Sequence, residues 1–462
     1  MSSSGAKSAV VIGAGITGLT AAHRLAKTGW RVCVLEASGR VGGAIGTEID
    51  RGWLVEKGPN SILSGEPALT GLIDELQLGT ERVAASSTAK NRYIVRGGRA
   101  VAAPLGPKEF LTSPLFSLYG KLRAATELFS PRRLRTTDLS LASFVRAHFG
   151  EEFVTYGLDP FVSGVYAGDP TKLSAKYSFP KLWETERTSG SLLRGQMATG
   201  KARRARGEPR PQIFSFRHGL QTLTDALAKA LPEDAIRLNA SIDALIPGAT
   251  WSVIWHDSDG ATHTEACDAV VLALPAPALA QVRVGALGER PLARLETMEH
   301  PPVSSLFLGF ERAGVAHPLD GFGMLVPSVE KRQVLGVLFS SSLFPGRAPA
   351  GHVALTVMVG GVRQPELARL DTGQLLATVM PDLEELLGVT GEPVYCRHTF
   401  WPRAIPQYQL GHETFLGAMA ACEREHPGLF LGGQPRDGIA VPACVAAGER
   451  LAEQVMRAAV RD

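Results

Sequence analysis

The chain has 462 residues, of which 45% are hydrophobic and 20% are charged, and its formal net charge is +3. This length predicts two or three globular domains, and the ordinary apolar fraction with a small net charge excludes a disordered chain. The five cysteines are scattered, odd in number and never form a CxxC pair. We therefore expect a reducing compartment, with neither a disulfide scaffold nor a metal site.

The sequence carries no signal for secretion or for crossing a membrane. Its first residues lack a basic segment followed by a long apolar run and a cleavage site, so no secretory signal is predicted. No stretch reaches the roughly 18 uninterrupted apolar residues that a spanning helix needs. The chain is therefore not expected to cross a membrane.

Charge is distributed unevenly along the chain. Residues 90–210 hold 21 Lys and Arg against 10 Asp and Glu, a local charge of +11, and the densest run is 201–210. Such a run is usually a solvated face. A basic block on a nearly neutral chain also suggests an anionic partner, with lipid headgroups, nucleic acid and an acidic substrate as the alternatives.

The first 36 residues predict a βαβ unit with a nucleotide-binding turn. The pattern gives a strand over 9–12, the sequence GAGITG at 13–18, a helix over 19–28 and a strand over 31–35 that ends at Glu36. The three glycines of GxGxxG allow a tight turn, close approach of a pyrophosphate and close helix–strand contact. The helix N-terminus would face the pyrophosphate, and Glu36 would accept from ribose hydroxyls. We predict a dinucleotide site here.

The end of the chain repeats the nucleotide-binding pattern, which predicts a domain assembled from separate segments. A short apolar strand at 428–431 leads through a glycine-containing loop to a helix over 444–459. Strand-like runs occur at 269–274, 304–310, 334–339 and 353–359, and helical patterns fill most of 113–210, including 141–149 and 153–158.

Further glycine-rich segments favour FAD over NAD as the dinucleotide. Arg40 and the doublet Gly42-Gly43 follow Glu36 closely, and a second backbone-exposing loop spans 56–61. A doublet alone could be a simple turn. FAD binds in an extended form and needs several such contacts, and a helix N-terminus after 432–441 would stabilise the charge of a reduced flavin.

These motifs resemble the FAD-dependent amine oxidase/phytoene desaturase superfamily, and within it the oxygen-dependent protoporphyrinogen oxidases. The superfamily motifs are the segment 13–18, Glu36 and Gly42-Gly43. The more specific motifs are Gly58-Pro59 and the segments 91–94, 164–168, 321–327, 356–361, 405–408 and 432–444. They follow one another in the family's order over nearly the whole chain.

The resemblance implies an α/β fold with three domains. A discontinuous Rossmann-like FAD-binding domain would comprise residues 1–88, 211–274 and 425–462. A mixed-sheet substrate domain would comprise 89–112 and 275–424, and a helical membrane-binding domain 113–210. The last coincides with the basic block.

The resemblance also assigns residues to the cofactor and to the substrate. The implied FAD contacts are Gly13, Ala14, Gly15, Ile16, Thr17, Gly18, Glu36, Ala37, Arg40, Gly43, Ala44, Gly58, Pro59, Asn60, Ser61, Ile242, Gln434, Ile439, Ala440 and Val441. The implied substrate contacts are Arg92, Gly164, Gly168, Phe322, Leu325 and Met358. Arg92 would pair with a propionate, and the apolar side chains would sandwich a tetrapyrrole disc.

The implied reaction is the six-electron oxidation of protoporphyrinogen IX to protoporphyrin IX, with hydride transfer to flavin N5 and reoxidation by O2 to H2O2. No protein side chain is expected to act as the catalytic group. Coproporphyrinogen III oxidation by the same fold, an FAD amine oxidase and a flavin-bound scaffold without turnover are the alternatives. A substrate with four propionates would call for a second basic residue in the pocket.

The resemblance implies a cytoplasmic enzyme attached peripherally to the inner face of the cell membrane. Its expected partners are the porphyrinogen, O2 and membrane lipid, with no nucleic acid. Whether the protein forms a homodimer is left open by the sequence.

Overall fold

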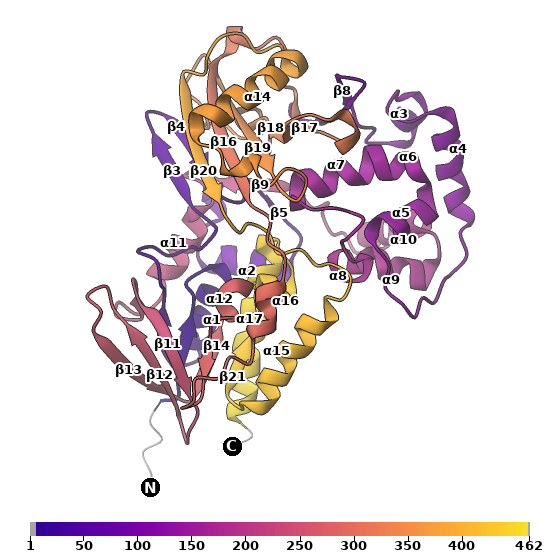
Figure 1. Ribbon diagram of the computed structural model, residues 1–462. Helices are drawn as coiled ribbons and strands as arrows, with labels where there is room; N and C mark the ends of the chain where they lie inside the picture. Colours follow the sequence, from indigo (N-terminus) through magenta and orange to yellow (C-terminus); the bar gives the residue numbers. More distant parts are fainter. Residues whose placement is uncertain (1–5, 461–462) are drawn as a thin grey trace.

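The computed structural model describes residues 6–460, which form three lobes (Figure 1). One lobe is built on a parallel sheet and holds both ends of the described chain. A second is built on a larger mixed sheet. The third consists of helices and lies beside the mixed sheet (Figure 1).

The parallel sheet has five strands in the order β10-β2-β1-β14-β21. They are β1 (Ser8–Ile12), β2 (Arg31–Leu35), β10 (Ile236–Arg237), β14 (Ala269–Leu272) and β21 (Leu429–Leu431). The strands come from three distant parts of the sequence, and the predicted strands at 9–12 and 31–35 are confirmed. Burial on both faces explains why these strands are continuous apolar runs.

Two helices pack together on one face of this sheet. They are α1 (Ile16–Lys27) and α17 (Val441–Ala459), the first and last helices of the chain. A Cβ on Gly448 would lie 2.5 Å from the carbonyl oxygen of Thr17, so a glycine is needed for this close approach. The predicted C-terminal helix is confirmed and begins three residues earlier than expected.

The other face of the parallel sheet is covered by a four-stranded sheet and by α15 (Glu413–Glu425). Its order is β13-β12-β11-β15, with β11 (Ser241–Ile246), β12 (Trp251–His256), β13 (Thr262–Cys267) and β15 (Arg283–Val284). One buried cluster joins β1 to Leu295 and to Met419 of α15. Residues near both ends of 275–424, assigned from sequence to the substrate domain, thus pack on the nucleotide-binding side. The domain boundaries stay predictions.

The mixed sheet has seven strands in the order β20-β16-β19-β18-β17-β7-β8. Their bounds are β7 (Asn91–Arg96), β8 (Arg99–Ala102), β16 (Val303–Glu311), β17 (Gly321–Leu325), β18 (Val334–Leu338), β19 (His352–Gly360) and β20 (Tyr395–Trp401). Helix α14 (Thr372–Leu387) covers one face through Leu375, Val379 and Leu383. The side chains of Asp371 and Gln374 form a capping box at the start of α14, in which each accepts a hydrogen bond from the backbone amide of the other residue.

The remaining elements of the two sheet lobes are short. The strands are β3 (Thr47–Asp50), β4 (Trp53–Glu56), β5 (Ile62–Leu63), β6 (Arg82–Ala84) and β9 (Ile213–Phe216). The helices are α2 (Pro67–Glu75), α11 (Gln221–Lys229), α12 (Ala276–Leu279), α13 (Ser340–Leu343) and α16 (Gln434–Asp437).

The helical lobe contains the helices within 113–210, where helical patterns were predicted. They are α4 (Leu118–Thr126), α5 (Leu141–Phe149), α6 (Glu151–Phe153), α7 (Asp159–Phe161), α8 (Ala175–Ser178), α9 (Pro180–Ser189) and α10 (Leu192–Ala205). Helix α3 (Pro107–Thr112) comes just before this range. The predicted helix at 141–149 is confirmed. The run predicted at 153–158 instead forms a π-helical turn at Val154–Leu158, and a second such turn spans Val162–Tyr166.

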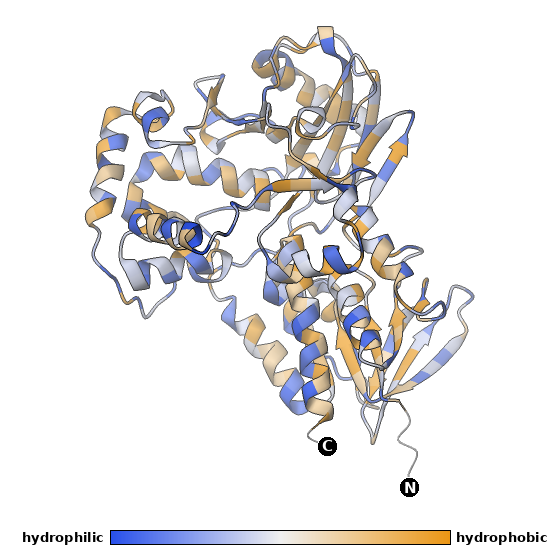
Figure 2. Cartoon of the chain, turned by 180° about the vertical axis from the view of Figure 1, so that it is seen from behind, coloured by the Kyte–Doolittle hydropathy of each residue, from blue (hydrophilic) through white to orange (hydrophobic). Residues whose placement is uncertain are grey.

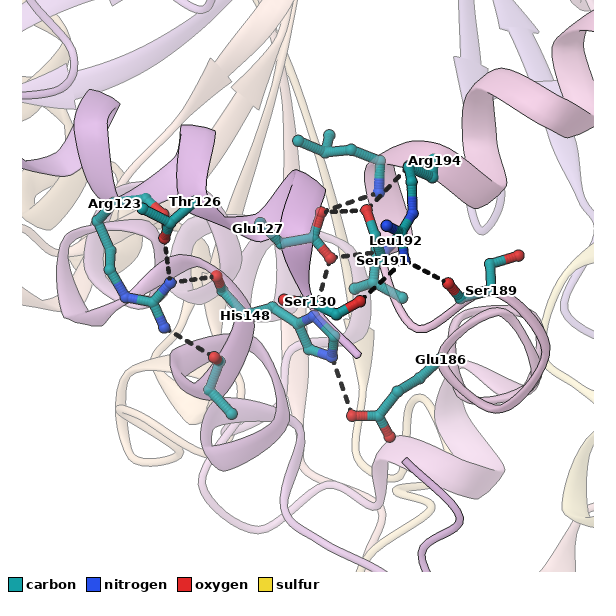
Figure 3. A network of polar contacts seen from close by, with 12 residues as sticks. Arg123, Thr126, Glu127, Ser130, His148, Glu186, Ser189, Ser191, Leu192 and Arg194 are labelled. Carbon is teal, nitrogen blue, oxygen red and sulfur yellow. Dashed lines mark hydrogen bonds and ion pairs between the residues drawn. The ribbon is translucent and has the colours of Figure 1, made fainter. Parts of the chain in front are cut away.

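A buried polar network holds the helical lobe together (Figure 3). The two ring nitrogens of His148 lie 3.0 Å from Glu127 Oε1 and 3.1 Å from Glu186 Oε1. Glu127 also accepts hydrogen bonds from the Ser191 hydroxyl and the Leu192 amide at the start of α10. Arg135 forms two hydrogen bonds with Glu186. His148, Glu127 and Glu186 are each buried, so the ring and the two carboxylates find their hydrogen-bond partners within the lobe.

Within residues 6–460, none of the helices combines the length and the apolar character needed to cross a bilayer.

Candidate active site

The glycine turn between β1 and α1 is shaped for close approach of a ligand to its backbone. A Cβ on Gly18 would lie 1.9 Å from the carbonyl oxygen of Gly13, and a Cβ on Gly13 would lie 2.7 Å from the carbonyl oxygen of Ala273. Gly15 differs, because a Cβ there would meet no heavy atom within 4 Å. The inner side of the turn is therefore tightly packed and its outer side is open.

Glu36 lies at the end of β2, beside this turn. One carboxylate oxygen accepts a hydrogen bond from the Ala14 amide at 2.8 Å, and the other accepts from the amide and hydroxyl of Ser38. A carboxylate can accept further hydrogen bonds, so Glu36 keeps the capacity to bind ribose hydroxyls. Ile242 is in β11, directly after the segment whose Ala240 amide donates to the Glu36 carbonyl.

The second glycine segment packs directly against the first. The Gly42 amide donates to the Ala14 carbonyl at 2.8 Å, and a Cβ on Gly43 would lie 3.2 Å from the Cα of Gly15. Gly43 has φ +57°, a conformation that favours glycine. The guanidinium of Arg40 donates to carbonyl oxygens of its own loop, those of Val41, Gly43 and Ile45. Arg40 thus shapes the loop, and its expected contact with phosphate stays a prediction.

The loop at 57–61 lies beside the second glycine segment. A Cβ on Gly58 would lie 2.0 Å from the carbonyl oxygen of Ala44, so the two segments touch along their backbones. The side-chain amide of Asn60 donates to the Gly58 carbonyl, and the Trp401 indole N–H donates to the Lys57 carbonyl at 2.9 Å. Strand β20 of the mixed sheet is thereby tied to the nucleotide-binding side.

The C-terminal segment closes the same region. A Cβ on Gly433 would lie 3.7 Å from the hydroxyl oxygen of Thr17 in the first turn of α1. Short helix α16 and Gly438 then lead to Ile439, Ala440 and the start of α17, whose first turn has no side-chain cap. Free amides at a helix start suit an anionic group.

Together these segments fit FAD. Four backbone stretches, at 13–18, 36–44, 58–61 and 433–441, meet side by side, and glycines make the approaches. The described residues hold no group of three or more His, Cys, Asp or Glu side chains arranged to bind a metal ion. When bound, FAD supplies the electron-accepting chemistry, and the protein supplies its position.

Two predicted substrate residues lie in one row across the mixed sheet. Leu325 of β17 pairs with Gly336 of β18, which pairs with Met358 of β19, so the side chains of Leu325 and Met358 project from one face on either side of Gly336. Because Gly336 has no side chain, Leu325 leans over it, and its Cδ2 would lie 3.1 Å from a Cβ there. The other face carries the core packed by α14.

The helical lobe covers this row. A Cβ on Gly164 would lie 2.4 Å from Leu325 Cδ2, and Met358 packs beside Ala167 and Leu335. A Cβ on Gly168 would lie 2.2 Å from Oε1 of Gln407. The two predicted glycines therefore allow the lobe to approach the sheet and the 405–408 segment closely.

Arg92 and Phe322 lie at the edge of the same region. Between Gly321 and Met324, β17 has one residue more than the facing stretch of β7, and this bulge changes the alternation of side chains. Phe322 comes to lie against Arg92, whose guanidinium carbon is 5.6 Å from the ring centroid. Within residues 6–460 Arg92 has no ion pair, so its charge is available to an anionic ligand.

Sequence reasoning did not assign a role to the side chains of Tyr408, His412 and Arg363. Tyr408 was noted only as part of a motif, although its hydroxyl bonds to two backbone groups of the C-terminal segment. His412 stacks on Tyr408 at 4.2 Å between ring centroids, and burial lowers its pKa to about 4. Arg363 pairs with Asp159 at 3.3 Å. Only three-dimensional contacts reveal these roles.

Comparison with known proteins places the chain in a family. The model for flavin containing amine oxidoreductases matches residues 16–456. Protoporphyrinogen oxidase 2 of Arabidopsis thaliana is 35% identical, with 97% of this chain and 94% of that protein covered. Coproporphyrinogen III oxidase of Bacillus subtilis is 29% identical, with 97% of each covered. A crystal structure of a candidate protoporphyrinogen oxidase from an Exiguobacterium species superposes with a TM-score of 0.83 at 25% identity, covering 98% of this chain and 99% of that one.

The chain belongs to the flavin-containing amine oxidoreductase family. The predicted resemblance, an enzymatic activity and FAD as cofactor are thereby confirmed, as is a mixed α/β fold of this type. The individual residue assignments stay predictions.

Proposed function

We propose that this protein oxidises protoporphyrinogen IX to protoporphyrin IX, using FAD and O2. The observation that carries the proposal is the row of Leu325, Gly336 and Met358 beneath Gly164, with unpaired Arg92 at its edge. A flat apolar disc with acidic substituents matches a sheet face with a guanidinium beside it. The similarity to plant protoporphyrinogen oxidases over nearly the full chain supports this substrate.

The site residues would bind and orient the substrate. Leu325 and Met358 would contact the tetrapyrrole face, and Gly164 lets the helical lobe approach the Leu325 side chain closely. Arg92 would hold a propionate through a charge-assisted hydrogen bond, which fixes the disc in its plane. FAD held by the glycine segments would supply the two-electron oxidation and its reoxidation by O2 to H2O2, and three such rounds account for the six electrons removed.

Coproporphyrinogen III is the second candidate, because B. subtilis coproporphyrinogen III oxidase is also similar over the whole chain. Its two additional propionates would need further cationic partners. Arg363 is the basic residue nearest in sequence to the 356–361 motif, and it donates to the Val326 carbonyl and pairs with Asp159. Because its charge is already matched, the arrangement favours the substrate with fewer carboxylates.

Steady-state oxidation of the two porphyrinogens, measured side by side, tests the proposal. We expect protoporphyrinogen to be oxidised with the higher kcat/KM and with three H2O2 formed per porphyrin. A higher kcat/KM for coproporphyrinogen would select the second candidate. Yellow protein that makes no peroxide with either would refute both and favour a scaffold.

We further propose that the helical lobe attaches the enzyme to anionic membrane lipid. Six large apolar side chains of α3, α4 and the segment after α4 are 60% to 83% exposed: Leu111, Leu118, Tyr119, Leu122, Phe129 and Leu134. Helix α4 forms the outer edge of the lobe, and apolar residues recur along it (Figures 1 and 2). Exposed Lys108, Arg132 and Arg133 lie in the same segment and would meet headgroups.

Flotation with liposomes tests this attachment. We expect binding to vesicles containing anionic lipid at low salt, and loss of binding in the variant with Leu118, Tyr119 and Leu122 all changed to Ser. Leu287→Ser is the matched control, because Leu287 is 91% exposed on the nucleotide-binding side. Failure of the unaltered protein to float, or equal binding by both variants, would contradict it. Attachment to the inner face of the cell membrane stays a prediction, as does a homodimer.

A further inference from the structure

The segment that follows β21 is held at both ends by a single side chain, that of Tyr408. The Tyr408 hydroxyl donates to the Gln434 carbonyl and accepts from the Gly438 amide at 2.9 Å. The phenol thereby bridges the first residue of α16 and the glycine directly after it. Tyr408 itself is 8% exposed.

This segment needs such a restraint because glycines bound it. Gly433 has φ +104° and Gly438 has φ +112°, conformations that favour glycine, and glycine has the widest backbone freedom of any residue. The four-residue helix between them makes few hydrogen bonds of its own. Asp437 restrains the beginning of the segment, where it accepts from the Gly433 amide and pairs with Arg450. Tyr408 adds the restraint at the Gly438 end, next to Ile439.

Tyr408 is itself anchored in the opposite direction. Its backbone carbonyl accepts hydrogen bonds from the Ser174 amide at 2.8 Å and the Ser178 hydroxyl at 3.1 Å, both in the helical lobe. The His412 ring stacks on the phenol and is 1% exposed. The position of the hydroxyl is therefore fixed by rigid surroundings on the side away from α16.

We infer that Tyr408 is a positioning residue that aligns the backbone of residues 438–441, and with it the start of α17, toward the bound flavin. The amides there stabilise negative charge only if they face the place where it develops. A reduced flavin carries that charge. The direction of the Gly438 peptide, which Tyr408 holds, sets the direction of the amides that follow it.

The inference rests on the FAD assignment alone, so it can be tested without any porphyrinogen. Tyr408→Phe removes the hydroxyl and keeps the ring stacked on His412. Tyr395→Phe is the control, because Tyr395 is a buried tyrosine of β20 whose hydroxyl has no hydrogen-bond partner among the described residues. The reduction potential of bound FAD in each holoenzyme is measured by equilibration with a reference dye.

In Tyr408→Phe the equilibrium constant for two-electron reduction is expected to fall about tenfold, the size of one hydrogen-bond contribution. Tenfold corresponds to a potential about 30 mV more negative. In the Tyr395→Phe control the potential should equal that of the unaltered protein. Equal potentials and flavin spectra in the two variants would overturn the inference.

If Tyr408→Phe is purified without flavin, titration of the apoprotein with FAD replaces the potential measurement. The inference then expects FAD to dissociate at least tenfold more readily, while the Tyr408→Phe apoprotein keeps the circular dichroism of the folded Tyr395→Phe apoprotein. Unchanged FAD affinity, or an apoprotein without the folded spectrum, would overturn the inference.

Discussion

The guanidinium carbon of Arg92 lies 5.6 Å from the centre of the Phe322 ring, at the edge of the mixed sheet. The pair joins the two features that the proposed substrate requires, a fixed positive charge and an apolar surface. A cation over an aromatic ring keeps its charge and loses some freedom of movement. Arg92 is therefore held ready for an anionic group.

Arg92→Ala is expected to raise KM for protoporphyrinogen about 10- to 100-fold and to leave the flavin content unchanged. The lost interaction is a hydrogen bond between charged groups, which contributes roughly 1.5–3 kcal/mol. Steady-state kinetics with a flavin absorbance measurement checks both outcomes.

Arg99→Ala serves as the control for this variant. Arg99 is an exposed arginine of β8, and its backbone lies opposite that of Arg96 in the same hairpin. We expect its kinetics to match those of the unaltered protein. Unchanged kinetics in Arg92→Ala, or an equal change in both variants, would contradict the role of Arg92.

Gly18→Ala is expected to abolish FAD binding and to destabilise the protein. The added methyl group would lie 1.9 Å from the Gly13 carbonyl oxygen, and the backbone must move to accept it. Forced overpacking of this kind costs about 1–3 kcal/mol or more. Flavin content and urea unfolding measure the two effects.

Gly71→Ala in α2 is the matched glycine control, since a Cβ there meets no heavy atom within 4 Å. This substitution should keep FAD and stabilise the helix by about 0.5–1 kcal/mol. Full flavin content in Gly18→Ala would show that the turn does not form the cofactor site.

His148→Ala is expected to destabilise the helical lobe by about 3–5 kcal/mol, because buried Glu127 and Glu186 each lose a hydrogen-bond partner and such losses cost most for charged groups (Figure 3). Urea unfolding, together with amide hydrogen exchange in α10, measures the loss. His263→Ala removes an exposed pair with Asp257 at 2.7 Å and should destabilise the protein much less. Similar costs for the two variants would contradict the account of the network.

His412 should make stability depend on pH between about 6.5 and 4. Burial lowers its pKa to about 4, and Tyr408, Tyr177 and Phe415 surround the ring with no carboxylate among them. Since the unfolded chain takes up the proton first, the stabilisation is complete above pH 6.5 and is lost as the pH falls toward 4.

His412→Leu is therefore expected to flatten the pH dependence of the unfolding temperature over this range. The difference corresponds to about 2–3 kcal/mol between the two ends. His218→Gln, at an exposed histidine, should leave the dependence unchanged. A His412→Leu profile parallel to that of the unaltered protein would contradict the prediction.

Local signals in the sequence predicted the nucleotide-binding half well. The glycines at 13–18 and Glu36 lie in one continuous βαβ unit, where each residue's neighbours along the chain are also its neighbours in space. Three strands of the mixed sheet, β16, β18 and β19, were likewise visible as apolar runs. The order of the strands in this sheet could not be predicted, because β7 pairs with β17 across more than 200 residues.

The rest of the site depends on contacts between distant segments. The bulge that brings Phe322 to Arg92 arises from one additional residue in β17, which no local pattern marks. The sequence predicted that Arg40 contacts a phosphate, but it could not show that three carbonyl groups of the same loop accept hydrogen bonds from the guanidinium. The π-helical turns also escaped prediction, because their periodicity lies close to that of an α-helix.

The central claim is that FAD bound against the glycine segments accepts electrons from a porphyrinogen lying over Leu325 and Met358. Anaerobic mixing of the purified yellow protein with protoporphyrinogen tests it most directly. The account predicts that the flavin absorbance bleaches and returns when O2 is admitted, with porphyrin formed. Flavin that stays oxidised in the presence of excess protoporphyrinogen and of excess coproporphyrinogen would contradict it.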